Sequence, residues 1–273
     1  IASQSVGVSE AAYREALSYA RERRQFGKAI IEFPAVSEML SLMKAKLDAS
    51  RSLLYETTRF VDMYKTLEDI SKERKLEKEE RDEMKRYQKQ ADAFTPMSKG
   101  MGSEFCNQNA YDCVQIHGGS GFMKDYACER IYRDARITSI YEGTTQLQVV
   151  AAIRHVTTGT YLNMMHYYEA QEVSGDLQTL RTRLKELTSI YAETVEQVTA
   201  TKDNDYIDFQ ARRMVEMAGH IIMSHLLILD TERNDSFRTS AEVYVRYAEA
   251  EVRKNAAFIA SFDINDMTYY RRN

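Results

Sequence analysis

The chain has 273 residues, a formal net charge of −4 at pH 7 and 29% charged residues. This length suits one large domain or two modest ones, each with its own core. No half of the chain forms a basic block, which argues against a nucleic-acid partner. Only 2 prolines and 11 glycines interrupt long runs of residues with good helix propensity. The composition therefore predicts an all-α protein, and we expect two domains.

The chain contains no run of about 18 apolar residues, so we expect no membrane span. Its longest apolar cluster, residues 221–229, is interrupted by polar side chains. Cys106, Cys113 and Cys128 are odd in number and match no disulfide or metal-ligand spacing, which favours a reduced, cytoplasmic compartment. The first residues already have the pattern of an amphipathic helix and lack a signal sequence. We therefore expect the chain to begin inside a longer parent protein.

Apolar side chains recur with helical spacing through the first part of the chain, and breakers separate the stripes. One break falls near Phe26-Gly27, and Pro34 suits the first turn of the helix that follows. Residues 68–90 are almost wholly charged, which predicts a solvated helical extension held by charge pairs three or four residues apart, or alternatively a docking surface. The helix from Pro34 is long, with an apolar stripe that runs to Phe60, and the other predicted helices cover residues 2–24, 96–117, 126–137 and 145–157.

After residues 157–159 the helical pattern restarts, with polar joints between segments. The four later helices are predicted over residues 162–171, 176–201, 205–230 and 236–261. They suggest a second antiparallel bundle, and no segment alternates at period two, so we expect essentially no sheet. The predicted domains are residues 1–159, a helical bundle with the charged extension, and residues 160–273, an appended helical bundle.

Glu142 lies between Tyr141 and Gly143 in a predicted turn before a helix. A carboxylate there can project into a cleft, where an apolar surrounding would raise its pKa toward that of a general base for a C–H proton. The alternative is a glutamate that merely favours the positive end of the helix dipole. From the residues alone, both readings stay open.

The glycine-rich segment at residues 117–121 can bring backbone N–H groups close to a phosphate or a cofactor. It can equally be a helix terminator. It lacks the spacing of a Rossmann or P-loop motif, and no strand precedes it. Similarly, residues 21–28 place cations, an amide and an aromatic ring at a helix end, either as an anion clamp or as favourable charge at a helix C-terminus.

Three stretches in this order, YARERRQFGKAI, VQIHGGSGFMKDYACERIYRDARI and SIYEGTTQLQ, resemble the hallmark segments of the acyl-CoA dehydrogenase C-terminal domain. The resemblance covers residues 1 to about 157. It implies a four-helix bundle of that type. Residues 160–273 are similar, by layout more than by motif, to the helical domain appended in a subset of the family. Membrane attachment known in some extended members is not expected, because no basic amphipathic segment stands out.

The resemblance implies an FAD-dependent enzyme that oxidises an acyl-CoA thioester to a trans-2-enoyl-CoA. In this family a carboxylate takes the α-proton while the β-hydride passes to N5 of FAD, and the electrons usually leave through an electron-transferring flavoprotein. It also implies a homodimer or homotetramer. The family's N-terminal helical domain and middle β-domain are not in this chain, so we expect the chain alone to be inactive.

Residue by residue, the family's Tyr-Glu-Gly-Thr motif makes Glu142 the base and places Tyr141 and Gly143 at the thioester. The residues that match flavin contacts of the family, some of them with the flavin of a neighbouring subunit, are Arg23, Gln25, Phe26, Gln115, Ile116, His117, Gly118, Gly119, Thr144 and Gln146. Two other classes stay open: an acyl-CoA oxidase-like flavoenzyme, and a non-catalytic helical oligomerisation module.

Overall fold

The structure is a computed structural model that describes residues 1–271, and it is almost entirely helical. The α-helices are α1 (Ala2–Glu22), α2 (Pro34–Glu73), α3 (Lys78–His117), α4 (Cys128–Ile137), α5 (Thr145–Thr157), α6 (Thr160–Glu169), α7 (Gln178–Ala200), α8 (Asn204–Arg233), α9 (Arg238–Ser261) and α10 (Met267–Tyr270). Short 3-10 turns η1 (Ile30–Glu32), η2 (Gly118–Phe122), η3 (Gly175–Leu177), η4 (Asp235–Phe237) and η5 (Ile264–Asp266) join some of them. The all-α prediction is confirmed.

One predicted boundary is wrong: α3 begins at Lys78, not near Pro96, which lies inside the helix. The charged segment supplies its own helix start, because the backbone N–H of Glu77 donates to the Glu80 carboxylate at 2.8 Å. Glu80 also pairs with Arg74 across the turn, at 2.6 Å. The predicted helical extension thus forms the far ends of two long helices.

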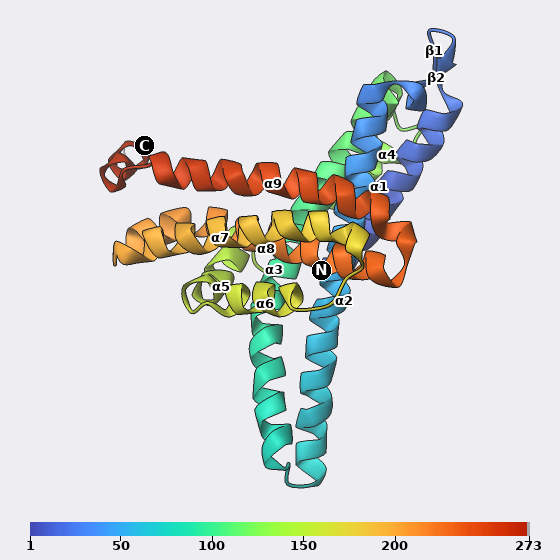
Figure 1. Cartoon of the computed structure of the whole chain (residues 1–273). Helices are drawn as coiled ribbons and strands as arrows, with labels where there is room; N and C mark the ends of the chain where they lie inside the picture. Colours follow the sequence, from blue (N-terminus) through green and yellow to red (C-terminus); the bar gives the residue numbers. More distant parts are fainter. Residues whose placement is uncertain (272–273) are drawn as a thin grey trace.

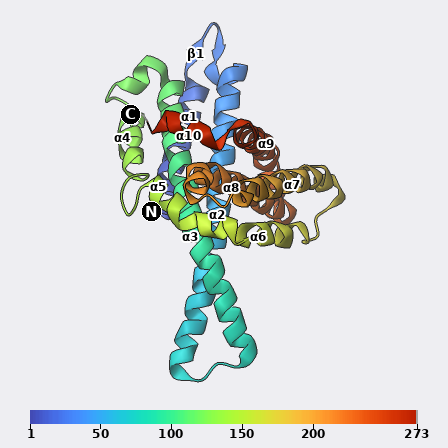
Figure 2. The same cartoon turned by 90° about the vertical axis from the view of Figure 1, so that its left-hand side faces the viewer.

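These two helices, α2 and α3, form an antiparallel hairpin whose tip extends beyond the rest of the molecule in both views (Figures 1 and 2). Helices α1 and α4 pack beside its other end. Helices α7, α8 and α9 run side by side across the hairpin in Figure 1, and α5 and α6 lie near the crossing. The second half of the chain therefore packs on the middle of the first.

The core is continuous across this crossing. The larger cluster of buried apolar side chains includes Phe60 and Phe94, whose rings meet edge to face at 5.0 Å, and extends into α6 to α9. Phe105 of α3 contacts the ring of Tyr244 of α9 at 6.1 Å. A smaller cluster lies under α1 and α4. The connection at Gly159, with φ of +71°, turns the chain from α5 into α6 beside the larger core.

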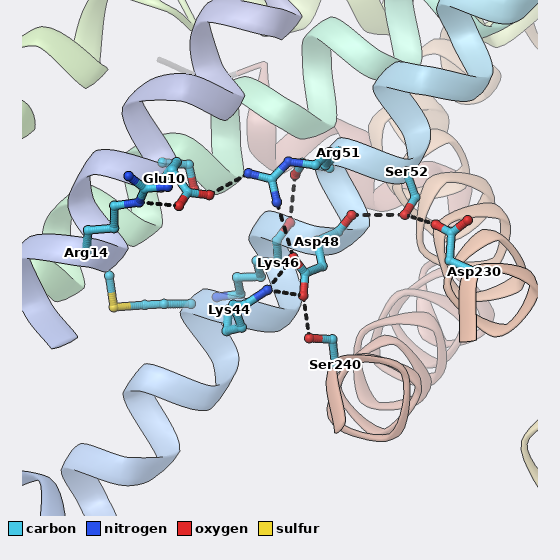
Figure 3. Close-up of polar contacts among 12 residues, drawn as sticks. Glu10, Arg14, Lys44, Lys46, Asp48, Arg51, Ser52, Asp230 and Ser240 are labelled. Carbon is cyan, nitrogen blue, oxygen red and sulfur yellow. Dashed lines mark hydrogen bonds and ion pairs between the residues drawn. The ribbon is translucent and has the colours of Figure 1, made fainter. Parts of the chain in front are cut away.

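A polar junction also ties the two halves together (Figure 3). Asp48 of α2 is 1% exposed and accepts hydrogen bonds from Lys44 at 2.6 Å and from Ser240 of α9 at 2.6 Å. One turn further along α2, Ser52 donates to Asp230 of α8 at 2.5 Å. Because buried carboxylates need such donors, the junction fixes how α8 and α9 sit on α2.

The only strands in residues 1–271 are β1 (Arg24–Gln25) and β2 (Lys28–Ala29), which pair antiparallel through a two-residue turn. The turn residues Phe26 and Gly27 have φ of +48° and +84°, as this hairpin type requires. The break predicted here is confirmed, and the strands are too short for an alternating pattern to be visible in the sequence. No helix in this part of the chain combines the length and apolar character needed to cross a membrane.

Candidate active site

The turn that carries Glu142 lies between α4 and α5 and has left-handed backbone at two consecutive residues. Glu142 has φ of +49° and Gly143 has φ of +87°. Thr144 then caps α5, because its hydroxyl accepts from the backbone N–H of Leu147 at 3.4 Å. Left-handed backbone is unfavourable for a residue other than glycine, and such strain concentrates at functional sites.

The Glu142 side chain is exposed and has no hydrogen-bond or ion-pair partner among residues 1–271. A glutamate with a structural task would be paired or would cap the helix. Here Thr144, not Glu142, caps α5. The left-handed turn therefore leaves the Glu142 carboxylate exposed and without a hydrogen-bond partner in the described residues.

Two side chains hold the backbone of this turn. The amide Nε2 of Gln148 donates to the carbonyls of Glu142 and Gly143 at 3.4 and 3.2 Å. The ammonium of Lys99, on α3, also donates to the Gly143 carbonyl. Lys99 is 6% exposed, and burial lowers its pKa below the usual range although the charges of Glu142 and Glu104 act in the opposite direction.

Sequence reasoning missed Lys99 and Gln148. One signal was present: Lys99 stands alone as a cation in the otherwise apolar and small run from residue 96 to residue 102. A lysine on a buried face needs a partner, but nothing in the sequence names that partner.

Helix α8, from the second half of the chain, also lies close to the residue that follows this turn, Thr145. Thr145 donates to the Glu104 carboxylate at 2.6 Å, and Arg212 of α8 lies 3.9 Å from that carboxylate. Arg212 also pairs with Glu216 at 2.8 Å. Glu104, Thr145 and Arg212 border a cavity of about 430 Å³, whose other lining residues include Asn107, Arg136, Ser139, Thr144 and Gln146. The cavity is thus rich in donors and lies at the N-terminus of α5.

Tyr141 and Gly143 flank Glu142 as the motif requires. The Tyr141 hydroxyl donates to the side chain of Gln4, which anchors the start of α1 to the turn. The proton of this hydroxyl is therefore used within the protein, and its oxygen can only accept a further hydrogen bond.

The other predicted flavin residues gather at the far end of α1. Arg23 and His117 line a cavity of about 290 Å³ together with Ser120 and Tyr126. The His117 ring stacks on Tyr19 at 4.2 Å, and its Nδ1 lies 2.7 Å from the carbonyl of Cys113. His117 is 3% exposed. It thus supports the loop from inside.

Around this loop, Gly118, Gly119 and Gln115 are exposed, and Ile116 is buried. The loop therefore offers its glycine backbone and the Gln115 amide to the outside, as expected of a surface that a cofactor approaches.

The predicted flavin residues thus fall into two groups. Thr144 and Gln146 line the cavity at α5, and Arg23 lies beside the glycine loop. Gln25 and the 93% exposed Phe26 form the end of the hairpin, which lies well apart from α5 in both views (Figures 1 and 2).

Cysteine and histidine side chains form no group that could hold a metal ion in residues 1–271. The three cysteines are free and buried, and burial raises the pKa of Cys106 and of Cys113 to about 12. These thiols are therefore poor nucleophiles.

Two family models match the chain: "Acyl-CoA dehydrogenase, C-terminal domain" over residues 1–157, and "Acyl-CoA dehydrogenase C terminal" over residues 157–267. The caffeyl-CoA reductase–Etf complex subunit CarC of Acetobacterium woodii is 39% identical over 148 residues, covering 54% of this chain and 33% of that protein. An acyl-CoA dehydrogenase of Bacillus subtilis is 34% identical over 160 residues, covering 59% and 36%. The chain spans about a third of the length of these relatives.

Among solved structures, an acyl-CoA dehydrogenase complexed with FAD from Bacillus anthracis has a TM-score of 0.72 at 24% identity, covering 97% of this chain and 49% of that one. Caenorhabditis elegans ACDH-11 in complex with C11-CoA has a TM-score of 0.68 at 21% identity, covering 90% and 41%. At these identities the likeness establishes the fold, and it extends through both halves of the chain.

Proposed function

Because the chain belongs to the acyl-CoA dehydrogenase family, we propose that it is the C-terminal part of an enzyme in which Glu142 removes the α-proton of an acyl-CoA thioester. The product is the trans-2-enoyl-CoA. The chain spans about a third of its curated relatives, so the activity belongs to the longer protein. This part alone is inactive in our proposal.

The observation that carries the proposal is the presentation of Glu142. Its carboxylate is exposed and unpaired on left-handed backbone, and Gln148 holds the carbonyls of Glu142 and Gly143. A general base must reach its proton within hydrogen-bond distance from a fixed position. A carboxylate on a held turn, free of competing partners, meets that requirement.

The residues present fit FAD as the cofactor. The donor-rich cavity at α5 offers Arg136, Ser139 and Thr144, which suit the oxygen atoms of a diphosphate or a ribityl chain. Arg23 and the glycine loop offer a second set of donors. When bound, FAD supplies the acceptor for the β-hydride. This chain's residues would then bind FAD and hold the Glu142 carboxylate next to the α-carbon of the thioester.

A homodimer or homotetramer fits the separation of the two groups of flavin residues. In such an assembly the group at α5 and the group at the glycine loop contact different flavins. The exposed Phe26 at the hairpin then becomes a contact between subunits.

For the electron acceptor we propose an electron-transferring flavoprotein. The name of the Acetobacterium woodii relative supports this, because it describes a subunit of a complex with Etf. The same name describes a reductase. In the reductive direction of the reaction proposed for the full-length protein, the hydride returns from the reduced flavin to the β-carbon and the protonated carboxyl of Glu142 returns the α-proton. We place the protein in the cytoplasm, because its three cysteines are free.

The test is anaerobic bleaching of the flavin in the full-length enzyme by a panel of saturated acyl-CoAs. Glu142→Gln keeps the size of the side chain and removes the base, so we expect it to retain FAD and to lose bleaching. Glu172→Gln is the matched control, because Glu172 is another exposed glutamate outside a helix, on the connection after α6.

If Glu142→Gln bleaches like the wild type, the base lies elsewhere and the proposal fails. If no saturated thioester bleaches the flavin but enoyl-CoAs reoxidise the reduced enzyme, the direction of the reaction is that of a reductase. Rapid oxygen uptake during turnover would instead identify an oxidase.

A further inference from the structure

Lys99 is a buried cation that forms no ion pair with a described carboxylate, although the charges of Glu142 and Glu104 act on it. It lies on α3 between the buried Ser98 and the half-buried Gly100, and its side chain is 6% exposed. No carboxylate lies within ion-pair distance of its ammonium among residues 1–271. Its hydrogen bond goes to the carbonyl of Gly143. A buried ammonium is expensive to desolvate, so its position beside a backbone carbonyl calls for an explanation.

The carbonyl that Lys99 contacts belongs to the residue after the proposed base. Both residues of this step are left-handed, with φ of +49° at Glu142 and +87° at Gly143. No hydrogen bond or ion pair holds the Glu142 carboxylate among residues 1–271, although its charge acts on the Lys99 ammonium, so the backbone of the turn sets where this side chain starts. A donor that fixes the Gly143 carbonyl therefore also fixes the direction in which the carboxylate projects.

Gln148 shares this task from the other side. Its amide reaches the same carbonyl at 3.2 Å, which uses both lone pairs of that oxygen. Gln148 is only half-buried and lies on α5, directly after the turn, whereas Lys99 comes from a different helix. Lys99 thus fixes the Gly143 carbonyl against α3, whereas the other contacts of the turn with distant helices are made by the side chains of Tyr141 and Thr145.

We propose that Lys99 is a positioning residue for the reaction: its ammonium holds the Gly143 carbonyl and so keeps the Glu142 carboxylate directed at the substrate. The proposal rests on the function proposed for Glu142. It assigns to Lys99 no contact with the substrate and no transfer of a proton.

The experiment measures flavin reduction in single turnover with the full-length enzyme, under anaerobic conditions and over a range of acyl-CoA concentrations. This separates substrate binding from the rate constant at saturation. For Lys99→Met we expect that rate constant to fall about 10²-fold, the effect of a misplacement near 1 Å. We expect the dissociation constant of the substrate and the FAD content to change little. Lys99→Arg, which keeps a charged donor, should recover at least part of the rate.

Lys46→Met is the matched control. Lys46 is also a buried lysine, 7% exposed with its pKa lowered by burial, but its ammonium lies over the ring of Tyr247 at 4.8 Å. The Lys46→Met variant therefore shows how much stability and rate are lost when any buried lysine is replaced. A purely structural role for Lys99 predicts that both variants lose thermal stability and rate alike, and that result overturns the proposal.

Failure of the two proposals can be told apart. If Glu142→Gln abolishes flavin reduction but Lys99→Met reduces its flavin as fast as Lys46→Met, only the positioning role is wrong. If Glu142→Gln remains active, the base is misassigned and the role of Lys99 falls with it. Should Lys99→Met not fold, Lys99→Gln decides, because its shorter neutral side chain stays polar but withdraws the ammonium from the Gly143 carbonyl: we expect at least a tenfold slower reduction, and an unchanged rate overturns the positioning role.

Discussion

The hydroxyl of Ser240, at the start of α9, donates to the carboxylate of Asp48 in the middle of α2, although the two residues are 192 positions apart. Both side chains are buried. This contact and the bond from Ser52 to Asp230 are two of the polar contacts that join the two halves of the chain (Figure 3).

The first prediction concerns this junction. Ser240→Ala removes a donor to a buried carboxylate, so we expect the free energy of unfolding to fall by about 2 kcal/mol. The measurement is urea denaturation followed by circular dichroism. Thr239→Ala is the control, because its exposed neighbouring hydroxyl has no partner among residues 1–271. Equal stability of the two variants would mean that the contact contributes nothing.

The second prediction concerns Gly143. An added Cβ would lie 2.8 Å from Nε2 of Gln148, on a residue with φ of +87°. Gly143→Ala should therefore displace Gln148, disturb the turn and slow flavin reduction about 10²-fold in the full-length enzyme. Gly159→Ala carries a similar backbone strain at φ of +71° but meets nothing within 4 Å. It should lose about 1 kcal/mol of stability and keep the rate; a similar rate loss in both variants would contradict the prediction.

The third prediction concerns the glycine loop. A Cβ at Gly121 would lie 2.5 Å from the backbone carbonyl of Val114 and 2.9 Å from Cβ of His117, and neither atom can move without shifting the end of α3. Gly121→Ala should lower the free energy of unfolding by about 1–3 kcal/mol. At Gly119 a Cβ meets nothing within 4 Å. Gly119→Ala should keep full stability, and its FAD content then reports whether the flavin approaches this backbone closely.

The fourth prediction concerns pH. His220 is buried with its Nδ1 3.2 Å from the Tyr244 hydroxyl, and burial lowers its pKa from 6.5 to about 3. As the pH falls, His220 therefore takes up a proton in the unfolded chain before it does so in the folded one. The stability that neutral His220 contributes is complete above pH 6.5 and is lost as the pH falls toward about 3, with a slope of up to about 1.4 kcal/mol per pH unit.

The measurement is the free energy of unfolding of wild type and His220→Phe between pH 7 and pH 4. The variant has no group to protonate at this position, so its stability should fall less steeply. Parallel curves for the two proteins would show that His220 does not take up a proton on unfolding in this range.

Most of the fold could be predicted from the sequence, because most of the helices carry an apolar stripe and end at a glycine or a polar joint. The start of α3 was missed for a physical reason. Pro96 suits the first turn of a helix, but here it lies inside one, flanked by the buried Phe94 and Met97. Packing at those neighbours outweighs the loss of one backbone hydrogen bond.

Only the part of the site formed by residues adjacent in the sequence could be predicted. The Glu142 turn is visible in a contiguous motif, whereas Lys99 is 44 positions from Gly143 and Glu104 is 41 positions from Thr145. Such contacts depend on how α3 is rotated about its axis relative to α5. The apolar stripe of a helix predicts which face is buried, but not which single side chain on that face meets a given residue of the other helix. The roles of the predicted flavin and substrate residues stay predictions.

The continuous core under α8 and α9 offers a way to sort relatives by reading their sequences. Met101 and Phe105 of α3 and Ala152 of α5 are buried members of this core. A family member without the second set of helices would expose these three positions to water unless another subunit covers them. Polar residues there should accompany a chain that stops after α5, and apolar residues a chain that continues. A chimera that joins the first part of one kind of chain to the second part of the other at residue 159 would have one of two defects. It would leave an apolar face uncovered, or it would bury polar groups without partners.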